Sequence, residues 1–229
     1  MLNLNVYPTT QFNDLEGIFV LNNMNENPLT SGSKYFSKGE YIYTPGEISD
    51  KVYYIIEGRV KISSHNSSGK EVTKAILNSG EIFGELSMIG QKKRCDFAYA
   101  MEGSEVVVLS SMKMKSLLNN DNKLSFSILK ILGSRILEVE QRLESLVFRN
   151  SRSRIVECLL ELVKKRGQRV GYEWVVRKFI THQEIANLTA TSRQTVTTVL
   201  NELRAQKLLT FNRKRLLIRD LENLSAQVA

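Results

Sequence analysis

The segment at residues 181–203, THQEIANLTATSRQTVTTVLNEL, has the pattern of two short helices joined by a tight turn. Thr181 with Glu184 three residues later predicts a capping box at the start of the first helix. Thr191 with Gln194 predicts the same arrangement for the second. The apolar residues recur at helical spacing and are Ile185 and Leu188, then Val196, Val199, Leu200 and Leu203. The two stripes predict a packed helix-turn-helix.

The second of these helices has a polar face that its apolar stripe leaves uncommitted. The residues on this face are Arg193, Gln194, Thr197 and Thr198. Arg and Gln at the start of an exposed helix can pair bidentately with base edges, so the pattern favours a helix that enters the DNA major groove. A helical hairpin with no role in DNA binding has the same pattern. Gln194 could also use its amide in the capping box and read no base.

The positive charge of the chain is confined to its last third. Residues 151–229 hold 15 Lys and Arg against 7 Asp and Glu, whereas residues 1–150 hold 17 of each. The net charge of +8 therefore belongs to the C-terminal part. A neutral module joined to a basic one suggests a sensor attached to a domain that binds a polyanion, and duplex DNA is the expected partner.

Length and composition limit the classes of protein to which this chain can belong. The 229 residues suffice for two domains with cores of their own. No apolar run approaches the roughly 18 residues of a membrane span, and no secretory signal is visible, so we expect a cytoplasmic protein without membrane contact. Two cysteines and two histidines predict neither a disulfide framework nor a metal cluster.

The first half of the chain has the pattern of a β domain. Short runs rich in β-branched and aromatic residues alternate with Gly-containing turns, and these runs lie at 41–44, 52–58, 59–63, 71–77 and 104–109. Strands of this length and spacing predict an antiparallel barrel or jelly roll. Before them, residues 14–24 are expected to form a short helix. The fold class is therefore α+β.

A long helix is expected at 121–148. It has a heptad seam with 3, 4, 3, 4, 3 spacing, formed by Leu129, Leu132, Ile136, Val139, Leu143 and Leu146. Ile128, Ile131 and Leu137 add a second apolar edge. The second edge can face the barrel while the seam meets another copy, so we expect a homodimer. The alternative is a single helix lying on the barrel.

The rest of the chain predicts a compact basic domain. A helix at 154–165 precedes a strand pair around 170–178, the two helices already described, and a hairpin at 209–218. The hairpin tip carries Arg213, Lys214 and Arg215, which would grip phosphates as a wing. The expected domains are a β-barrel effector domain at 1–118, a dimerisation helix at 119–149 and a winged helix-turn-helix at 150–229.

Barrel, long helix and winged helix-turn-helix in this order resemble the Crp/Fnr family of bacterial transcription regulators. The resemblance covers roughly residues 34–218 and is most specific in ITHQEIANLTATSRQTVTTVLNEL and GEIFGELSMIGQKKRC. It implies a dimeric DNA-binding regulator that is not an enzyme, with RNA polymerase as a possible partner. A barrel enzyme and a nucleotide-binding module that acts on a partner protein are the alternatives from other classes.

The resemblance also implies an effector pocket for a cyclic nucleotide such as cyclic AMP or cyclic GMP. The matching residues are Gly84, Glu85, Leu86, Arg94 and Cys95. Arg94 would pair with the cyclic phosphate, and backbone N–H groups at Glu85 and Leu86 would form a small anion nest. Glu85 would accept a hydrogen bond from the ribose 2′-hydroxyl. The alternative is an ordinary surface ion pair between Glu85 and Arg94.

Two departures from the family pattern affect this pocket. Cys95 replaces a hydroxyl residue, and a thiol is a poor hydrogen-bond donor. Val139 and Glu140 stand where cAMP-responsive members have the Thr-Ser pair that meets the base. A degenerate pocket, another effector and a regulator active without ligand therefore remain open. Haem and iron–sulfur sensing are not expected, because His65, His182 and two distant cysteines are poor ligand sets. Redox sensing through Cys95 stays conceivable.

The second helix of the helix-turn-helix is the recognition helix, the one expected to enter the major groove. In it, Arg193 matches the family's guanine-reading Arg, while Gln194 and Thr198 replace a Glu and a second Arg. We expect Arg193 to read a G and Gln194 an adjacent A, with Thr198 making at most a methyl or phosphate contact. The half-site should then differ from TGTGA. The remaining expected DNA contacts are Thr181, His182, Gln183, Ser192 and Thr197.

Overall fold

The computed structural model describes residues 32–67 and 69–228. The chain divides into two compact units, of which the first ends at Arg135 and the second begins at Ile136. The short helix expected at 14–24 lies outside the described residues. Each unit is described separately below.

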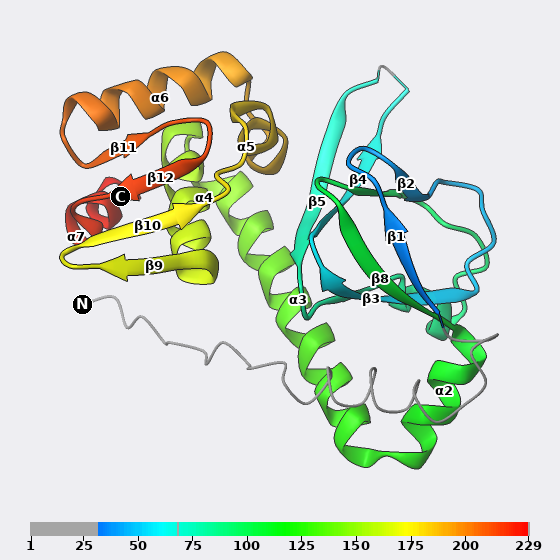
Figure 1. Cartoon of the computed structure of the whole chain (residues 1–229). Helices are drawn as coiled ribbons and strands as arrows, with labels where there is room; N and C mark the ends of the chain where they lie inside the picture. Colours follow the sequence, from blue (N-terminus) through cyan, green and yellow to red (C-terminus); the bar gives the residue numbers. More distant parts are fainter. Residues whose placement is uncertain (1–31, 68, 229) are drawn as a thin grey trace. The chain divides into compact units, whose positions relative to one another are not determined.

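The first unit is built from two four-stranded antiparallel sheets (Figure 1). One sheet has the order β1-β8-β3-β6 and the other β2-β7-β4-β5. The strands are β1 (Ser33–Phe36), β2 (Tyr41–Tyr43), β3 (Lys51–Glu57), β4 (Arg59–His65), β5 (Glu71–Asn78), β6 (Ile82–Phe83), β7 (Phe97–Ala100) and β8 (Ser104–Ser110). This architecture confirms the antiparallel β fold expected from the sequence.

Alternation of side chains along the strands fills the space between the sheets. Ile55 and Phe83 from one sheet and Val60, Ile62 and Leu77 from the other belong to the same buried cluster. Such two-sided burial explains why these strands are rich in β-branched and aromatic residues. The barrel is thus packed with its own apolar side chains.

Two helices follow the last strand, α2 (Ser111–Asn120) and the long α3 (Asn122–Phe148). The last strand of the β domain therefore ends at Ser110. Helix α2 occupies the ten residues between this strand and the long helix expected at 121–148. Asp121 starts α3, because its Oδ1 accepts hydrogen bonds from the N–H groups of Lys123 and Leu124 at 2.8 and 3.1 Å.

The first part of α3 packs on the β domain. Leu124, Ile128 and Ile131 are buried in one cluster with strand residues and Met114 of α2. This confirms the apolar edge expected at Ile128 and Ile131. The same expectation for Leu137 was wrong, since its side chain is 46% exposed. The reason is that Leu137 lies beyond Arg135, where α3 has left the first unit.

The second unit contains the end of α3, a four-stranded sheet and several short helices. The helices are α4 (Ser151–Arg166), α5 (His182–Thr189), α6 (Arg193–Ala205), α7 (Leu221–Ser225) and the 3-10 helix η2 (Ala226–Val228). The strands are β9 (Gly167–Val170), β10 (Glu173–Arg177), β11 (Leu209–Phe211) and β12 (Arg215–Ile218), in the order β11-β12-β10-β9. These elements confirm the expected winged helix-turn-helix, with β11 beside α6 (Figure 1).

The turn between β3 and β4 offers a matched test of the first unit's packing. Gly58 has φ +97°, and a Cβ there would lie 2.3 Å from Ser104 Oγ and 2.6 Å from the Gly103 carbonyl oxygen. Gly39 also has positive φ, +85°, but a Cβ there would meet no heavy atom within 4 Å. We expect Gly58→Ala to destabilise the unit more than Gly39→Ala, by about 1–3 kcal/mol of overpacking. Urea unfolding of both variants measures the difference, and equal losses would contradict the packing described.

Candidate functional site

The helix-turn-helix begins with the capping box expected from the sequence. The Thr181 Oγ1 accepts from the Glu184 N–H at 3.2 Å, and Glu184 Oε2 accepts from the Thr181 N–H at 2.7 Å. Ile185 and Ala186 form the buried face of α5. The chain then turns at Ala190, whose φ of +50° ends the helix. These features fix where α6 starts.

The start of α6 differs from the expected one by a residue. Ser192, not Thr191, is the N-cap, and its Oγ accepts from the Thr195 N–H at 3.0 Å. The predicted capping box of Thr191 and Gln194 was therefore wrong. Its physical reason is that the Thr191 hydroxyl is hydrogen-bonded to that of Thr189 at 2.9 Å, inside the turn. Gln194 is thus not used to cap the helix.

The two faces of α6 are cleanly separated. The inward face consists of side chains at most 5% exposed, namely Val196, Val199, Leu200 and Leu203. Arg193, Gln194 and Thr198 are exposed on the outer face, as is the N-cap Ser192. Burial of the stripe therefore orients the hydrogen-bonding side chains toward solvent, where a ligand can reach them.

A small polar network links the two helices. His182 Nδ1 lies 2.9 Å from Thr197 Oγ1, and the Thr197 hydroxyl donates to the Arg193 carbonyl oxygen at 2.9 Å. The His182 ring also makes an edge contact with Phe211 of the hairpin. The pKa of His182 is lowered mainly by the partial burial of its ring and, to a smaller extent, by the positive charge of Arg193. His182 therefore favours the neutral form and holds Thr197 in place.

The β11–β12 hairpin is shaped by its own turn. Asn212 Oδ1 accepts from the N–H groups of Lys214 and Arg215 at 2.8 and 2.9 Å. Such an Asx-type turn needs no core contact and leaves the neighbouring side chains free to point outward. Arg213, Lys214 and Arg215 are all exposed.

The helix-turn-helix and the hairpin together border a hollow of about 670 Å³. Its lining residues are Phe179, Ile180, Thr181, His182, Gln183, Arg193, Phe211, Asn212 and Arg213. Five of the residues expected to contact DNA are therefore brought around one concavity. The others lie on the outer face of α6 or further along the hairpin.

The expected effector pocket is centred on the turn before the 3-10 helix η1 (Glu85–Ile89). Gly84 has φ +74°, and a Cβ there would lie 2.9 Å from Arg94 Nη1 and 3.0 Å from the Lys51 carbonyl oxygen. Glycine is therefore required by both the backbone conformation and the close approach of Arg94. Glu85 is half-buried, while Leu86 and Cys95 are exposed.

Arg94 is held inside the unit rather than on its surface. It is only 3% exposed, and its guanidinium donates to the carbonyl oxygens of Gly84 and Lys51 at 3.1 and 2.5 Å. The guanidinium also lies 4.4 Å from the centroid of the Tyr43 ring. Its Nε is buried without a hydrogen-bond partner. A buried charge with an unused donor is a candidate anion contact.

Two tyrosines complete the wall around Arg94. Burial raises the pKa of both Tyr43 and Tyr53, so both phenols stay protonated at neutral pH. The ring of Tyr53 stacks on Phe83 with centroids 4.7 Å apart. The protein's own aromatic side chains therefore occupy much of the space beside Arg94.

Arg135 contacts the expected effector site and was not predicted from the sequence. Its Nη1 donates to Glu85 Oε1 at 2.7 Å, and its Nη2 donates to the Ile82 carbonyl oxygen. The alternative ion pair between Glu85 and Arg94 was thus wrong. A signal was available in the sequence, because Arg135 continues the buried stripe of Ile128 and Ile131 at helical spacing. A charge on a buried stripe calls for a partner.

Five of the six residues of the heptad seam are exposed on α3. Leu129, Ile136, Val139 and Leu143 are each at least 60% exposed. Leu132 is partly buried against the first unit's core, and Leu146 is exposed. A contiguous apolar stripe of this length is unusual on a surface and is typical of a helix that has a partner.

Among residues 32–67 and 69–228 no group of three or more His, Cys, Asp or Glu side chains is placed to hold a metal ion. Within the same ranges, every helix is too short or too polar to cross a bilayer.

A β-sandwich, a long helix and a winged helix-turn-helix in this order define a class of DNA-binding transcription regulator. Residues 33–121 match the cyclic nucleotide-binding domain family, and residues 153–227 match the Crp-like helix-turn-helix domain family. The chain belongs to the Crp/Fnr family of transcription regulators, which bind DNA and are not enzymes.

Individual relatives agree with this assignment. The global nitrogen regulator of Nostoc sp. is 31% identical over 84% of this chain and 87% of the relative. The CRP-like cAMP-activated global transcriptional regulator of Mycobacterium tuberculosis is 28% identical over 83% and 85% of the two chains. A CooA mutant from Carboxydothermus hydrogenoformans superposes with a TM-score of 0.78, at 26% identity, over 92% of this chain and 94% of its own.

The lowered pKa of His182 predicts a pH-dependent stability of the second unit. Because the folded pKa lies below the unfolded value of 6.5, the unfolded chain binds the proton more tightly. The stability contribution is complete above pH 6.5 and is lost as the pH falls below it. We expect wild type to lose stability relative to His182→Asn between pH 7.5 and pH 5.5 in urea unfolding. If the difference in unfolding free energy between wild type and His182→Asn does not change with pH, the lowered pKa of His182 is contradicted.

Proposed function

We propose that this transcription regulator binds a pseudo-palindromic duplex site as a homodimer, with α6 of each copy in a major groove. The observation that carries the proposal is the division of α6 into a buried apolar face and an exposed face bearing Arg193, Gln194 and Thr198. A helix oriented in this way presents bidentate donors at its N-terminus, where helix-turn-helix proteins contact bases.

Within the half-site, Arg193 is assigned to a G and Gln194 to an adjacent A. Arg donates two hydrogen bonds to G O6 and N7, whereas the amide of Gln both donates to A N7 and accepts from A N6. The N-cap at Ser192 supports the second assignment, because it leaves the Gln194 amide out of the capping box. Because the side chain of Thr198 is short, we assign it a contact with a thymine methyl group or with a phosphate.

The remaining polar residues are assigned to the DNA backbone, which sets register without reading sequence. Around the hollow these are Thr181, His182, Gln183 and Arg213. Ser192 and Thr197 lie at the start of α6, and Lys214 and Arg215 on the hairpin. The N-terminus of α5 adds its dipole to these contacts.

Substitution of Arg193 tests base reading. Arg193→Ala is expected to weaken binding to the selected site by about 1–3 kcal/mol and to relax the preference for G at one position of each half-site. The matched control is Arg213→Ala, which should weaken all duplexes alike and reduce the salt slope by about 1. Fluorescence anisotropy with the selected site and its single-base variants measures both effects. Equal losses on specific and random DNA for Arg193→Ala would show a phosphate contact instead.

The homodimer proposal is supported by the exposed seam of α3. Two copies that pair through Leu129, Leu132, Ile136, Val139, Leu143 and Leu146 would bury this stripe. A dimer also places two recognition helices on successive major grooves, about 34 Å apart. The boundaries 1–118, 119–149 and 150–229 remain the proposed effector, dimerisation and DNA-binding segments.

Charge on the seam tests this dimer. The double variant Val139→Lys, Leu143→Lys places like charges in the paired stripe, so we expect a monomer with much weaker binding to the palindrome. The control, Gln141→Lys with Glu144→Lys, adds lysines at exposed positions off the seam. Analytical ultracentrifugation gives the oligomeric state of each. A dimer that survives the seam substitutions would contradict the proposed interface.

For the effector, we propose a small anion, with a cyclic nucleotide such as cyclic AMP or cyclic GMP as the first candidate. Three features support the pocket formed by Gly84, Glu85, Leu86, Arg94 and Cys95: the match to the cyclic nucleotide-binding family, the unused Nε donor of Arg94, and the backbone N–H groups at the start of η1. Glu85 pairs with Arg135 through one carboxylate oxygen, so the other can accept from a ribose hydroxyl.

A regulator that works without ligand is the second candidate. Its supporting observation is that Gly84, Lys51 and Tyr43 already satisfy most of the Arg94 guanidinium. Cys95, Val139 and Glu140 also lack the hydroxyl groups that cAMP-responsive relatives would use. In either case we propose action in the cytoplasm, with RNA polymerase as the further partner of such a regulator.

A further inference from the structure

Asn201 lies on the same outer face of α6 as Gln194 and Thr198. At about 100° for each residue, it is about 20° from Gln194 and about 60° from Thr198 around the helix axis. All three side chains are exposed, on the side of the helix opposite the buried stripe. The outer face therefore presents a second amide, two helical turns after Gln194.

The amide of Asn201 is oriented by Arg204. The Nη2 group of Arg204 donates to Asn201 Oδ1 at 3.0 Å. The Arg204 guanidinium in turn lies 5.2 Å from the centroid of the Phe211 ring, a cation–π contact. Within the described ranges, the bond from Arg204 engages one lone pair of Oδ1 and leaves the second lone pair and both N–H groups available.

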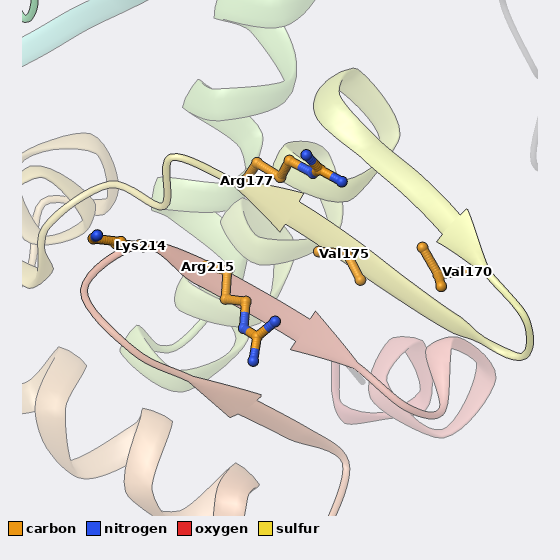
Figure 2. Close-up of a pocket in the computed structure, with 5 residues that line it drawn as sticks. All are labelled: Val170, Val175, Arg177, Lys214 and Arg215. Atoms are coloured by element: carbon orange, nitrogen blue, oxygen red, sulfur yellow. The ribbon is translucent and has the colours of Figure 1, made fainter.

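Phe211 gives this contact a firm support. It ends β11, which contacts α6 and is paired with β12. Figure 2 shows β12, which begins at Arg215, beside β10, which carries Arg177. The ring beneath Arg204 is therefore part of the four-stranded sheet, so the orientation of Asn201 is fixed by the body of the unit.

We infer that Asn201 is a third base-reading residue, which selects an adenine in the major groove, and that Arg204 positions it. The inference rests on the proposed DNA recognition by α6. An Asn amide donates to A N7 and accepts from A N6, and Asn201 has both a donor and a lone pair available for this pairing. Its place in line with Gln194, rather than at the edge of the face, favours a base edge over a phosphate.

Helix geometry gives the position of this adenine. Asn201 follows Gln194 by two turns, a distance of about 10 Å along α6 at about 1.5 Å for each residue. Stacked base pairs are about 3.4 Å apart, so the adenine is expected about three base pairs from the one assigned to Gln194. A preference there extends each half-site beyond the positions read by Arg193 and Gln194.

Site selection with the full-length Asn201→Ala variant tests the inference. Under the conditions in which wild type selects a palindrome, the variant should keep the bases assigned to Arg193 and Gln194. It should lose the preference at one position, about three base pairs away in each half-site. On duplexes that differ only there, wild type should prefer adenine roughly 5- to 100-fold, and the variant should bind all four alike.

The positioning role of Arg204 is tested by Arg204→Met. This variant should reduce the same adenine preference in the wild-type background and should not change it further in the Asn201→Ala background. Removal of the charge weakens binding to every duplex alike. The readout is therefore the ratio of affinities between duplexes, in which this general loss cancels.

The matched control is Gln206→Ala, which also removes an exposed amide at the end of α6 but lies about 140° from Asn201 around the axis. It should keep every base preference of wild type, and thermal unfolding checks that all variants are folded. If Asn201→Ala selects the wild-type site with the same preferences, or binds all four duplexes equally less well, base reading by Asn201 is overturned and the proposed DNA recognition stands. Failure of wild type to select any palindrome would overturn both.

Discussion

Burial of the α6 stripe is the interaction on which the function of this protein depends. Val196, Val199, Leu200 and Leu203 fix the rotation of the helix about its axis, and Ser192 fixes where it begins. Because both are set, Arg193 and Gln194 occupy the first turn of an exposed face. A helix rotated by one residue would turn these side chains by about 100° and remove them from the proposed base-reading position. The proposed base-reading surface is thus a consequence of core packing.

The proposed effector pocket is in contact with the long helix α3 through Arg135, which pairs with Glu85 and donates to the Ile82 carbonyl oxygen. Arg135 reaches Glu85 at the pocket turn, and the chain passes from the first unit to the second directly after Arg135. A ligand that competes for Glu85 would therefore act on the helix that carries the seam. Such a ligand changes the regulator only if it binds one arrangement of this helix better than another. Arg94, whose Nε is buried without a hydrogen-bond partner, would supply the charge that attracts it.

The sequence predicted the elements that are encoded locally. The capping box at Thr181, five of the eight strands of the β domain and the apolar face of α6 follow from short-range patterns, whereas the short strands β1, β6 and β7 were not predicted. The N-cap of α6 did not, because Thr191 and Ser192 are adjacent hydroxyl residues and a contact with Thr189 decides between them. Helix α2 was missed because it is only ten residues long and Met114 is its one fully buried side chain, so its sequence shows no extended apolar stripe. The Glu85 partner required a contact across 50 residues, which no local pattern encodes.

Selection of binding sites from a random duplex pool tests the central claim most directly. The purified protein is used alone, with cyclic AMP and with cyclic GMP. We predict a palindrome whose half-sites carry the G and A assigned to Arg193 and Gln194. Enrichment only with a nucleotide would support effector control through Arg94 and Glu85, whereas the same palindrome in every arm would support the regulator that works without ligand. The absence of any palindrome from all three arms would contradict sequence-specific recognition by α6.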